Sequence, residues 1–139
     1  MVYEMVKEEF PILKIEKLTQ EQAERVQRKV RGGNWIAHNG AWVIAPKIAV
    51  ICYDYNPVTV DENNAGQKNN YPNVENENIF HKHNIRSRLA KIDDTSEKVF
   101  GIHGSDNAYE AQHMLHEIYA ANVSDVNHGI LEEVQKHTV

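Results

Sequence analysis

Two periodicities of apolar residues divide the N-terminal part of the chain. In "MVYEMVKEEF" the apolar positions recur at intervals of three and four, at Val2, Met5, Val6 and Phe10, and this spacing predicts a helix. The helix is expected to end before Pro11, because a residue that precedes proline is disfavoured in the helical conformation. "ILKIEKL", residues 12–18, then alternates apolar and charged side chains, which predicts a half-buried strand.

A second helix is expected after this strand. Thr19 and Gln22 have the spacing of a capping box, in which Thr19 caps the first helical amides and Gln22 reaches back to the Thr19 amide. The apolar positions that follow lie on one helical face: Ala23, Val26 and Val30. Gly32-Gly33 ends the pattern, as glycine commonly does just beyond a helix.

The next segment, residues 34–55, is the most strand-like part of the sequence. Asn39-Gly40 lies between two apolar stretches, and this dipeptide is a strong signal for a β-hairpin. The run from Lys47 to Tyr55 is apolar on both faces for much of its length, so we expect it near the centre of a sheet. Cys52 lies in this run and is expected to be buried and inert; as a single cysteine it excludes an intrachain disulfide.

From Asn56 to Asn84 the character of the chain changes. This segment is crowded with asparagine, contains Pro57, Gly66 and Pro72, and has almost no apolar periodicity. It is predicted to be a long loop. Long segments without secondary structure are uncommon inside compact domains, and they are often functional or disordered.

The rest of the chain contains a strand and helical segments. "NIRSRLAKI", residues 84–92, fits either a short helix or a strand, and "KVFGI", residues 98–102, predicts a strand. The helix predicted after Asp106 has one apolar side, formed by Ala108, Ala111, Leu115, Ile118 and Tyr119. Beyond Asn127 we expect a last amphipathic turn or two, with the apolar residues Ile130, Leu131 and Val134.

This order of elements predicts an α+β fold. Strands interspersed with helices are expected to form a ferredoxin-like antiparallel sheet with helices packed on one face. With 139 residues, the chain is expected to be a single domain that can bury a core and that includes the long loop at about 56–84.

Composition and charge narrow the class of function. The residues are 41% hydrophobic and 25% charged, as in a globular protein, and the formal net charge is -5. Such a chain is not drawn to nucleic acid or to an anionic membrane by its overall field, so a nucleic-acid partner is not expected. The apolar runs are too short for a membrane span, and the N-terminus has no signal-type apolar core. We therefore expect no membrane association and a cytoplasmic location.

The run "HGSD", residues 103–106, lies where the last predicted strand meets a predicted helix. The first amides of a helix have no partner within it, and they favour an anion such as phosphate. Gly104 allows a ligand to approach the backbone closely. The neutral imidazole of His103 can attack phosphorus and hold the phosphoryl group covalently.

Positive charge for the phosphate oxygens is expected from the basic segment before this motif. Arg86 and Arg88 are the nearest candidates, and the planar guanidinium group can hold two phosphate oxygens at once. Lys82 and Lys91 stand behind them as further cations. Phosphoryl transfer requires mostly positioning and positive charge, which such a set supplies.

A purely structural interpretation of the motif stands beside this one. Ser105 or Asp106 can be an ordinary N-cap that accepts hydrogen bonds from the first helical amides. His103 is then only the last residue of its strand, and the motif carries no chemistry.

The segment "IHGSDNAYEA" resembles the active-site signature of nucleoside diphosphate kinases, in which an HGSD run holds the phosphate-accepting histidine just before a helix. Upstream, "ILKIEKLTQEQAERV" resembles the second strand and the following helix of that family, and "KIAVICYDY" occupies the place of its central strand. "NIRSRL" stands where the family has an Ile-Arg pair whose arginine contacts phosphate. The resemblance implies a phosphohistidine at His103 and Mg2+ bound with the nucleotide. It also implies a phosphate contact from Arg86. We count Arg88, Gly104 and Asp106 as further phosphate-binding candidates and Ser105 as a catalytic one.

Parts of the family's pattern have no clear counterpart here. The family's first strand, with its Lys-Pro-Asp run, is absent from the sequence, and Phe100 stands where the family has an asparagine. The glutamate that buttresses the histidine would fall at Met114, with Glu110 or Glu117 as substitutes. Two functions stay open: a phosphotransferase, or a non-catalytic module of the same fold that binds a nucleotide or a protein. The absent first strand favours a homo-oligomer, because an uncovered sheet edge can be covered by another subunit.

Histidine spacing raises a metal site as a further alternative. His81 and His83 alternate and would share one face of a strand, and His113 and His116 would share a helical face. With a third nitrogen from His103, such pairs can ligate zinc or nickel. No HExxH or cysteine-based spacing is present, so solvated histidines are the simpler interpretation and no metal ligand is assigned.

Overall fold

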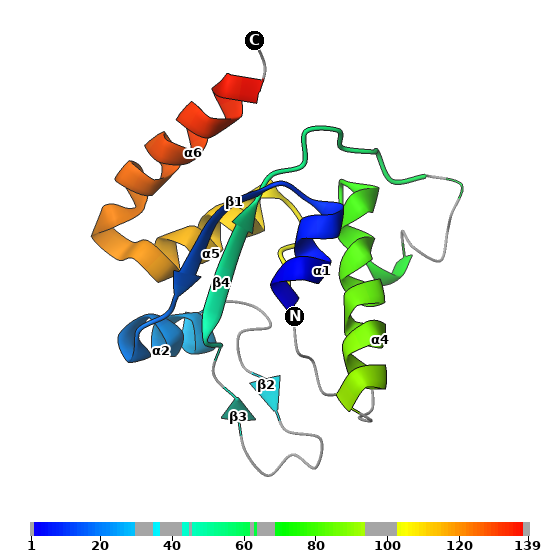
Figure 1. Ribbon diagram of the computed structural model, residues 1–139, viewed down its shortest axis with the longest axis horizontal. Coiled ribbons are helices and arrows are strands. Elements are labelled where there is room, and N and C mark those ends of the chain that lie inside the picture. Colours follow the sequence, from blue (N-terminus) through cyan, green and yellow to red (C-terminus); the bar gives the residue numbers. More distant parts are fainter. Residues whose placement is uncertain are drawn as a thin grey trace.

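The computed structural model describes residues 2–29, 35–36, 43–44, 46–61, 63, 69–93 and 103–137. Its elements are, in chain order, α1 Val2–Glu9, β1 Ile12–Lys17, α2 Gln20–Lys29, β2 Trp35–Ile36, β3 Val43–Ile44, β4 Ile48–Cys52, η1 Glu77–Phe80, α4 His81–Asp93, α5 Ala108–Tyr119, η2 Ala120–Asn122 and α6 Val123–His137. The structure contains both helices and antiparallel strands (Figure 1), so the predicted α+β class is confirmed.

Strands β1 and β4 form an antiparallel pair in which Ile15 lies opposite Val50 and Lys17 lies opposite Ile48. The predicted strand over 12–18 is therefore confirmed, and the strand predicted over 47–55 is shorter than expected. Strands β2 and β3 form a second antiparallel pair. They flank the predicted Asn39-Gly40 turn, which itself lies outside the described residues.

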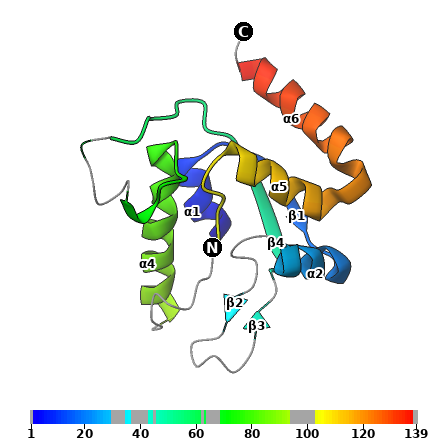
Figure 2. The ribbon, with the colours of Figure 1, turned by 180° about the vertical axis from the view of Figure 1, so that it is seen from behind.

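Helices cover both faces of the β1·β4 pair, as Figures 1 and 2 show from opposite sides. Ala49 and Ile51 of β4 pack in a first cluster with α2 and α5, whose buried residues are Val26, Leu115, Ile118 and Tyr119. Val50 packs in a second cluster with α1 and α4, whose buried residues are Met5, Val6, Ile85 and Leu89. Successive side chains of a strand point to opposite faces. The prediction that helices pack on one face is therefore wrong.

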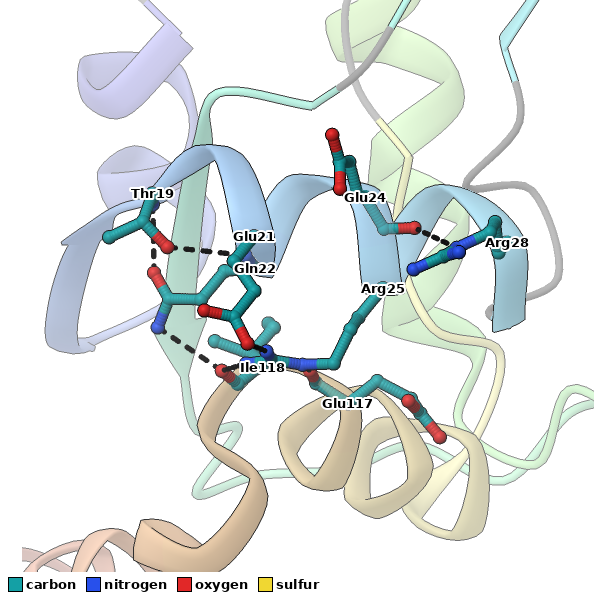
Figure 3. A network of polar contacts seen from close by, with 8 residues as sticks. All are labelled: Thr19, Glu21, Gln22, Glu24, Arg25, Arg28, Glu117 and Ile118. Carbon is teal, nitrogen blue, oxygen red and sulfur yellow. Dashed lines mark hydrogen bonds and ion pairs between the residues drawn. The ribbon is translucent and has the colours of Figure 1, made fainter.

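The C-terminal end of α5 is joined to α2 by hydrogen bonds to backbone carbonyls (Figure 3). Arg25 donates from Nε to the Glu117 carbonyl (2.7 Å) and from Nη2 to the Ile118 carbonyl (2.9 Å), which also accepts from Gln22 Nε2 (3.1 Å). The last carbonyls of a helix have no partner within it, so α2 supplies donors for them. The predicted capping box is confirmed, because Gln22 N donates to Thr19 Oγ1 and Thr19 N donates to Gln22 Oε1.

Helix α6 follows α5 after the short turn η2. The turn begins at Ala120, whose φ of 49° and ψ of -119° are rarely adopted by residues with a side chain. The predicted final turn or two beyond Asn127 is part of a longer helix, α6, and Ile130 packs against the first cluster. None of the described helices, α6 included, is both long and apolar enough to cross a membrane.

The long loop predicted over 56–84 ends earlier than expected. Residues 77–80 form η1 and His81 begins α4, which also decides the ambiguous segment 84–92 in favour of a helix. Asn76 is the N-cap of η1 and accepts a hydrogen bond from Asn78 N. Asparagine is common in loops but is also a preferred N-cap, so the asparagine-rich composition concealed this helix start. The strand predicted over 98–102 lies outside the described residues.

Cys52 lies at the end of β4 and is exposed, so the prediction that it is buried is wrong. The atoms around its sulfur still desolvate the thiol, and together with the charge of Asp54 they raise its pKa to about 11. A thiol with this pKa carries little thiolate at neutral pH. The raised pKa therefore comes from the local surroundings of the sulfur and not from burial of the whole residue.

Candidate functional site

The start of helix α4 is held by a hydrogen-bonded cluster around Asp54. Asp54 Oδ2 accepts from the side-chain amides of Asn76 (2.7 Å) and Asn78 (2.8 Å), and Asp54 Oδ1 accepts from Asn56 N (2.9 Å). Burial alone would raise the pKa of Asp54, but these hydrogen bonds to the carboxylate outweigh burial and lower the pKa. The chain after β4 is thereby connected to η1, which leads directly into α4.

Lys82, on the first turn of α4, joins this helix to the HGSD segment. Its Nζ donates to Asp106 Oδ1 (2.5 Å) and to the Gly104 carbonyl (3.3 Å). Both charged side chains are nearly buried, with exposed fractions of 11% for Lys82 and 10% for Asp106. A Cβ added at Gly104 would lie 3.5 Å from Lys82 Cδ, so the backbone at Gly104 lies against the lysine side chain. These contacts hold the segment 103–106 against α4.

Arg86 and His83 interact electrostatically with the same ion pair. Arg86 lies four residues after Lys82 and therefore on the same face of α4. Burial lowers the pKa of Arg86, and the charges of Tyr71 and Asp106 act in the opposite direction. Burial also lowers the pKa of His83; the positive charges of Arg86 and Lys82 lower it further, while Asp106 opposes them. The first two turns of α4 and the HGSD segment thus form one cluster of charged and ionisable groups.

His103 and Ser105 precede α5 and are half-buried, and the Nε2 atom of His103 is shielded from solvent. The N-cap of α5 is Asn107, whose Oδ1 accepts from Glu110 N (2.8 Å). The predicted cap at Ser105 or Asp106 is therefore wrong. The Asp106 carboxylate forms an ion pair with α4 instead, and the cap falls one residue later.

Arg88 does not join this cluster. Its Nη1 lies 2.9 Å from Glu8 Oε2 of α1, and the two side chains are 47% and 57% exposed. Lys91 is exposed as well. On a strand, Arg86 and Arg88 would share a face, whereas residues two apart on a helix point in different directions. Of the two predicted phosphate-binding arginines, Arg86 interacts with the motif and Arg88 is directed to α1.

The three positions considered for a buttressing carboxylate lie in different surroundings on α5. Met114 packs against the first hydrophobic cluster. Glu117 lies near the C-terminal end of the helix, where its carbonyl accepts from α2. Glu110 lies in the first turn and is half-buried. Glu110 is therefore the carboxylate at the same end of α5 as the motif.

A recess of about 440 Å³ lies beside the start of α4. Its lining includes the rings of Tyr71, Phe80 and His83 and the polar side chains of Glu77 and Asn84. The centroids of the three rings are 5.2 to 5.9 Å apart. These three rings therefore pack against one another at the edge of the recess.

The histidine pairs do not converge on a metal site. His81 and His83 lie on α4, so the expectation that they share a face, which assumed a strand, is wrong. His81 Nδ1 lies 3.4 Å from Glu9 Oε2, and His113 Nε2 lies 3.0 Å from the Lys29 carbonyl. Within the described ranges, no group of three or more histidine, cysteine, aspartate or glutamate residues is arranged to hold a metal ion.

Lys82 contacts the HGSD segment directly, although the sequence indicated it only as a cation behind Arg86 and Arg88. Only a helical assignment for this segment places it with Arg86 at i and i+4 on one face. No local signal indicates its pairing with Asp106, 24 residues later.

In comparisons with known proteins, no family model, no curated protein and no solved structure matches this chain.

Proposed function

We propose that this protein binds a nucleotide with its phosphates at the segment 103–106 and transfers a phosphoryl group through a phosphohistidine at His103. The observation that carries the proposal is the attachment of this segment to a cationic helix face, through the contacts of Lys82 with Asp106 and the Gly104 carbonyl. A histidine, a glycine and a helix start beside the half-buried Arg86 form a chemically suitable set for phosphate.

Arg86 is the cation that we assign to the phosphate oxygens. It lies on the Lys82 face of α4 and interacts with the charge of Asp106. Arginine remains protonated when its pKa is lowered by burial, and its guanidinium group is less strongly hydrated than an ammonium group. Gly104 and the first amides of α5 are the backbone elements expected to approach the phosphates. Ser105 remains a catalytic candidate.

The reaction proceeds in two displacement steps. His103 attacks the γ-phosphorus of a nucleoside triphosphate; a P–N bond forms while the P–O bond to the β-phosphate breaks, and the nucleoside diphosphate leaves. A terminal oxygen of a second diphosphate then attacks the phosphorus, the P–N bond breaks and the neutral imidazole returns. We assign the attack to Nδ1, because Nε2 is shielded from solvent. Mg2+ enters as part of the nucleotide substrate.

Three further predictions from the sequence belong to the same proposal: a ferredoxin-like sheet, assembly into a homo-oligomer and a cytoplasmic location. The antiparallel pairing of β1 with β4 supports the ferredoxin-like sheet. Ile15 of β1 and Ile48 of β4 are 46% and 61% exposed, which supports a contact of this strand pair with another subunit. Light scattering at several protein concentrations tests assembly into a homo-oligomer, and a strict monomer would contradict it.

The decisive test is phosphohistidine formation. Wild-type protein incubated with γ-labelled ATP and Mg2+ is expected to acquire an acid-labile, alkali-stable label. His103→Ala is expected to acquire none, whereas His128→Ala, at a side chain that is 73% exposed on α6, keeps it. An unlabelled wild-type protein would contradict phosphoryl transfer.

A second test uses the different surroundings of the two arginines. Arg86→Ala is expected to weaken ADP binding by about 10- to 100-fold, because it removes a charge-assisted contact to phosphate. Arg88→Ala removes the same side chain at a position that pairs with Glu8, and it is the matched control that leaves the affinity unchanged. Equal losses in both variants, measured by calorimetry, would contradict the assignment of Arg86.

A non-catalytic nucleotide-binding module is the second candidate. The observation that favours it is Met114, which packs in the core at the position where the family has its buttressing carboxylate. This candidate predicts ADP binding that depends on Arg86 and no label on His103. The two tests together therefore distinguish it from the phosphotransferase.

A further inference from the structure

We infer that Lys82 and Asp106 act together as positioning residues for His103, fixing the backbone of the segment that presents its ring to a phosphate. The inference rests on the proposed function of His103. According to this inference, Asp106 pairs with Lys82 and does not bind phosphate. Lys82 affects the reaction by holding the segment 103–106 and does not contact the substrate.

The contacts restrain the segment on the C-terminal side of His103. Lys82 Nζ donates to the carbonyl of the next residue, Gly104 (3.3 Å), and to the side chain of Asp106, three residues along (2.5 Å). The chain is then fixed at Asn107, whose Oδ1 caps α5. Hydrogen bonds are directional, so these contacts set the direction of the backbone as well as its distance from α4.

Stability alone does not account for an ion pair in this place. Lys82 and Asp106 are 11% and 10% exposed, so both charges are largely removed from water. Apolar side chains of similar volume at a buried ion pair are often as stabilising or more so. Such side chains would fill the space, but they could not bind a carbonyl and a carboxylate in a fixed orientation.

The pair also limits repulsion between Asp106 and a bound phosphate. Asp106 interacts electrostatically with both Arg86 and His83, which places its charge near the cation that we assign to phosphate. An unpaired carboxylate there would repel the phosphate oxygens, and the repulsion would be strong where water is largely excluded. Pairing with Lys82 reduces this repulsion.

The experiment compares wild type, Lys82→Met, Asp106→Leu and the double variant Lys82→Met/Asp106→Leu. Each single variant is expected to melt at a lower temperature, because it leaves one buried charge without its partner. The double variant is expected to recover most of the melting temperature. Its rate of phosphohistidine formation at saturating ATP, however, is expected to stay about 100-fold below wild type, since small misplacements of reacting groups have effects of that size.

The matched control is the exposed ion pair of α6. Lys136 Nζ lies 2.9 Å from Glu133 Oε1, and the two side chains are 69% and 49% exposed. Lys136→Met/Glu133→Leu introduces the same two apolar side chains at a lysine–carboxylate pair, and it is expected to leave the labelling rate unchanged. If the buried double variant does not fold, Lys82→Arg decides. A planar guanidinium group cannot reproduce the ammonium contacts, so a folded Lys82→Arg protein is expected to label at least about tenfold more slowly.

The outcomes separate the inference from the proposed function. A wild-type protein without label overturns both. A labelled wild type together with a folded double variant that labels at the wild-type rate overturns the positioning role alone, as does a Lys82→Arg protein with an unchanged rate. A stable double variant that labels slowly supports the inference, because a purely structural role would recover with the melting temperature.

Discussion

The two ends of helix α5 are joined to the rest of the protein in different ways. At the C-terminal end, Arg25 and Gln22 of α2 donate to the carbonyls of Glu117 and Ile118. At the N-terminal side, the segment that leads into α5 is held to α4 by an ion pair in which both side chains are about nine-tenths buried. We call these the α2–α5 junction and the α4–α5 junction.

The difference lies in the acceptors. The α2–α5 junction uses neutral carbonyls that every helix end leaves without an intrahelical partner, and its arginine also pairs with Glu21, a largely exposed carboxylate. The α4–α5 junction places two full charges where little water reaches them, which carries a desolvation cost. The first arrangement is what a stable helix end requires, whereas the second is the one that we propose for orienting the segment of His103.

The largest expected effect comes from removing one donor at each junction. Lys82→Met leaves the buried Asp106 carboxylate without its partner and is expected to destabilise the fold by about 3 kcal/mol or more. Arg25→Met leaves two neutral carbonyls and the exposed Glu21 carboxylate without this donor, so no buried charge loses its partner. The expected loss is about 1–2 kcal/mol. Urea unfolding of both variants measures the two free energies. Equal losses would remove the distinction between the junctions.

Removal of the helix caps is expected to have smaller and similar effects. Asn107→Ala removes the cap of α5 and a hydrogen bond to the Asn73 carbonyl (2.9 Å), and Thr19→Ala removes the cap of α2. Each change is expected to cost about 1 kcal/mol, because both caps are neutral hydrogen bonds. Thermal unfolding tests this. A loss at Asn107 as large as that of Lys82→Met would mean that the cap, and not the ion pair, fixes the α4–α5 junction.

A change at the C-terminal end of α5 is expected to stabilise the protein. Ala120 has a φ of 49°, which glycine adopts without a steric penalty. Ala120→Gly is therefore expected to raise the free energy of unfolding by about 1 kcal/mol. Ala121→Gly, at the next residue of η2, is the control and is expected to lower it by about 0.5–1 kcal/mol. A loss in both variants would show that the backbone at Ala120 is not strained.

The smallest expected effect is a pH dependence at the α4–α5 junction. The folded protein lowers the pKa of His83 below its ordinary value of 6.5, first through burial and then through the charges of Arg86 and Lys82. The unfolded chain therefore binds more protons than the folded one as the pH falls past 6.5. The stability that this group contributes is complete well above pH 6.5 and is lost as the pH falls toward the folded pKa.

The measurement compares urea midpoints at about pH 7.5 and about pH 5.5, on either side of the histidine range. His83→Gln is expected to reduce the difference between them, while His128→Gln, on the exposed face of α6, keeps it. An undiminished pH dependence in His83→Gln would assign the titration to another group.

The sequence by itself determined the elements that depend on neighbouring residues. The apolar spacing over 2–10, the alternation over 12–18 and the Thr19/Gln22 capping box each correspond to an element or contact found in the structure. The helix after Asp106 was also predicted, and it buries Leu115, Ile118 and Tyr119 as its apolar spacing requires. These features follow from periodicity and from contacts within one turn, so they can be predicted without knowledge of the tertiary structure.

The tertiary structure alone decided how the site is assembled. Arg86 and Arg88 have the same chemistry and nearly the same place in the sequence, yet one interacts with the HGSD segment and the other with α1. Asp106 and Asn107 are likewise neighbours, yet Asp106 pairs with Lys82 across the fold and Asn107 caps α5. The physical reason is distance along the chain: which side chains meet across 24 residues depends on how α4 and α5 pack around β1 and β4, and no local pattern encodes it.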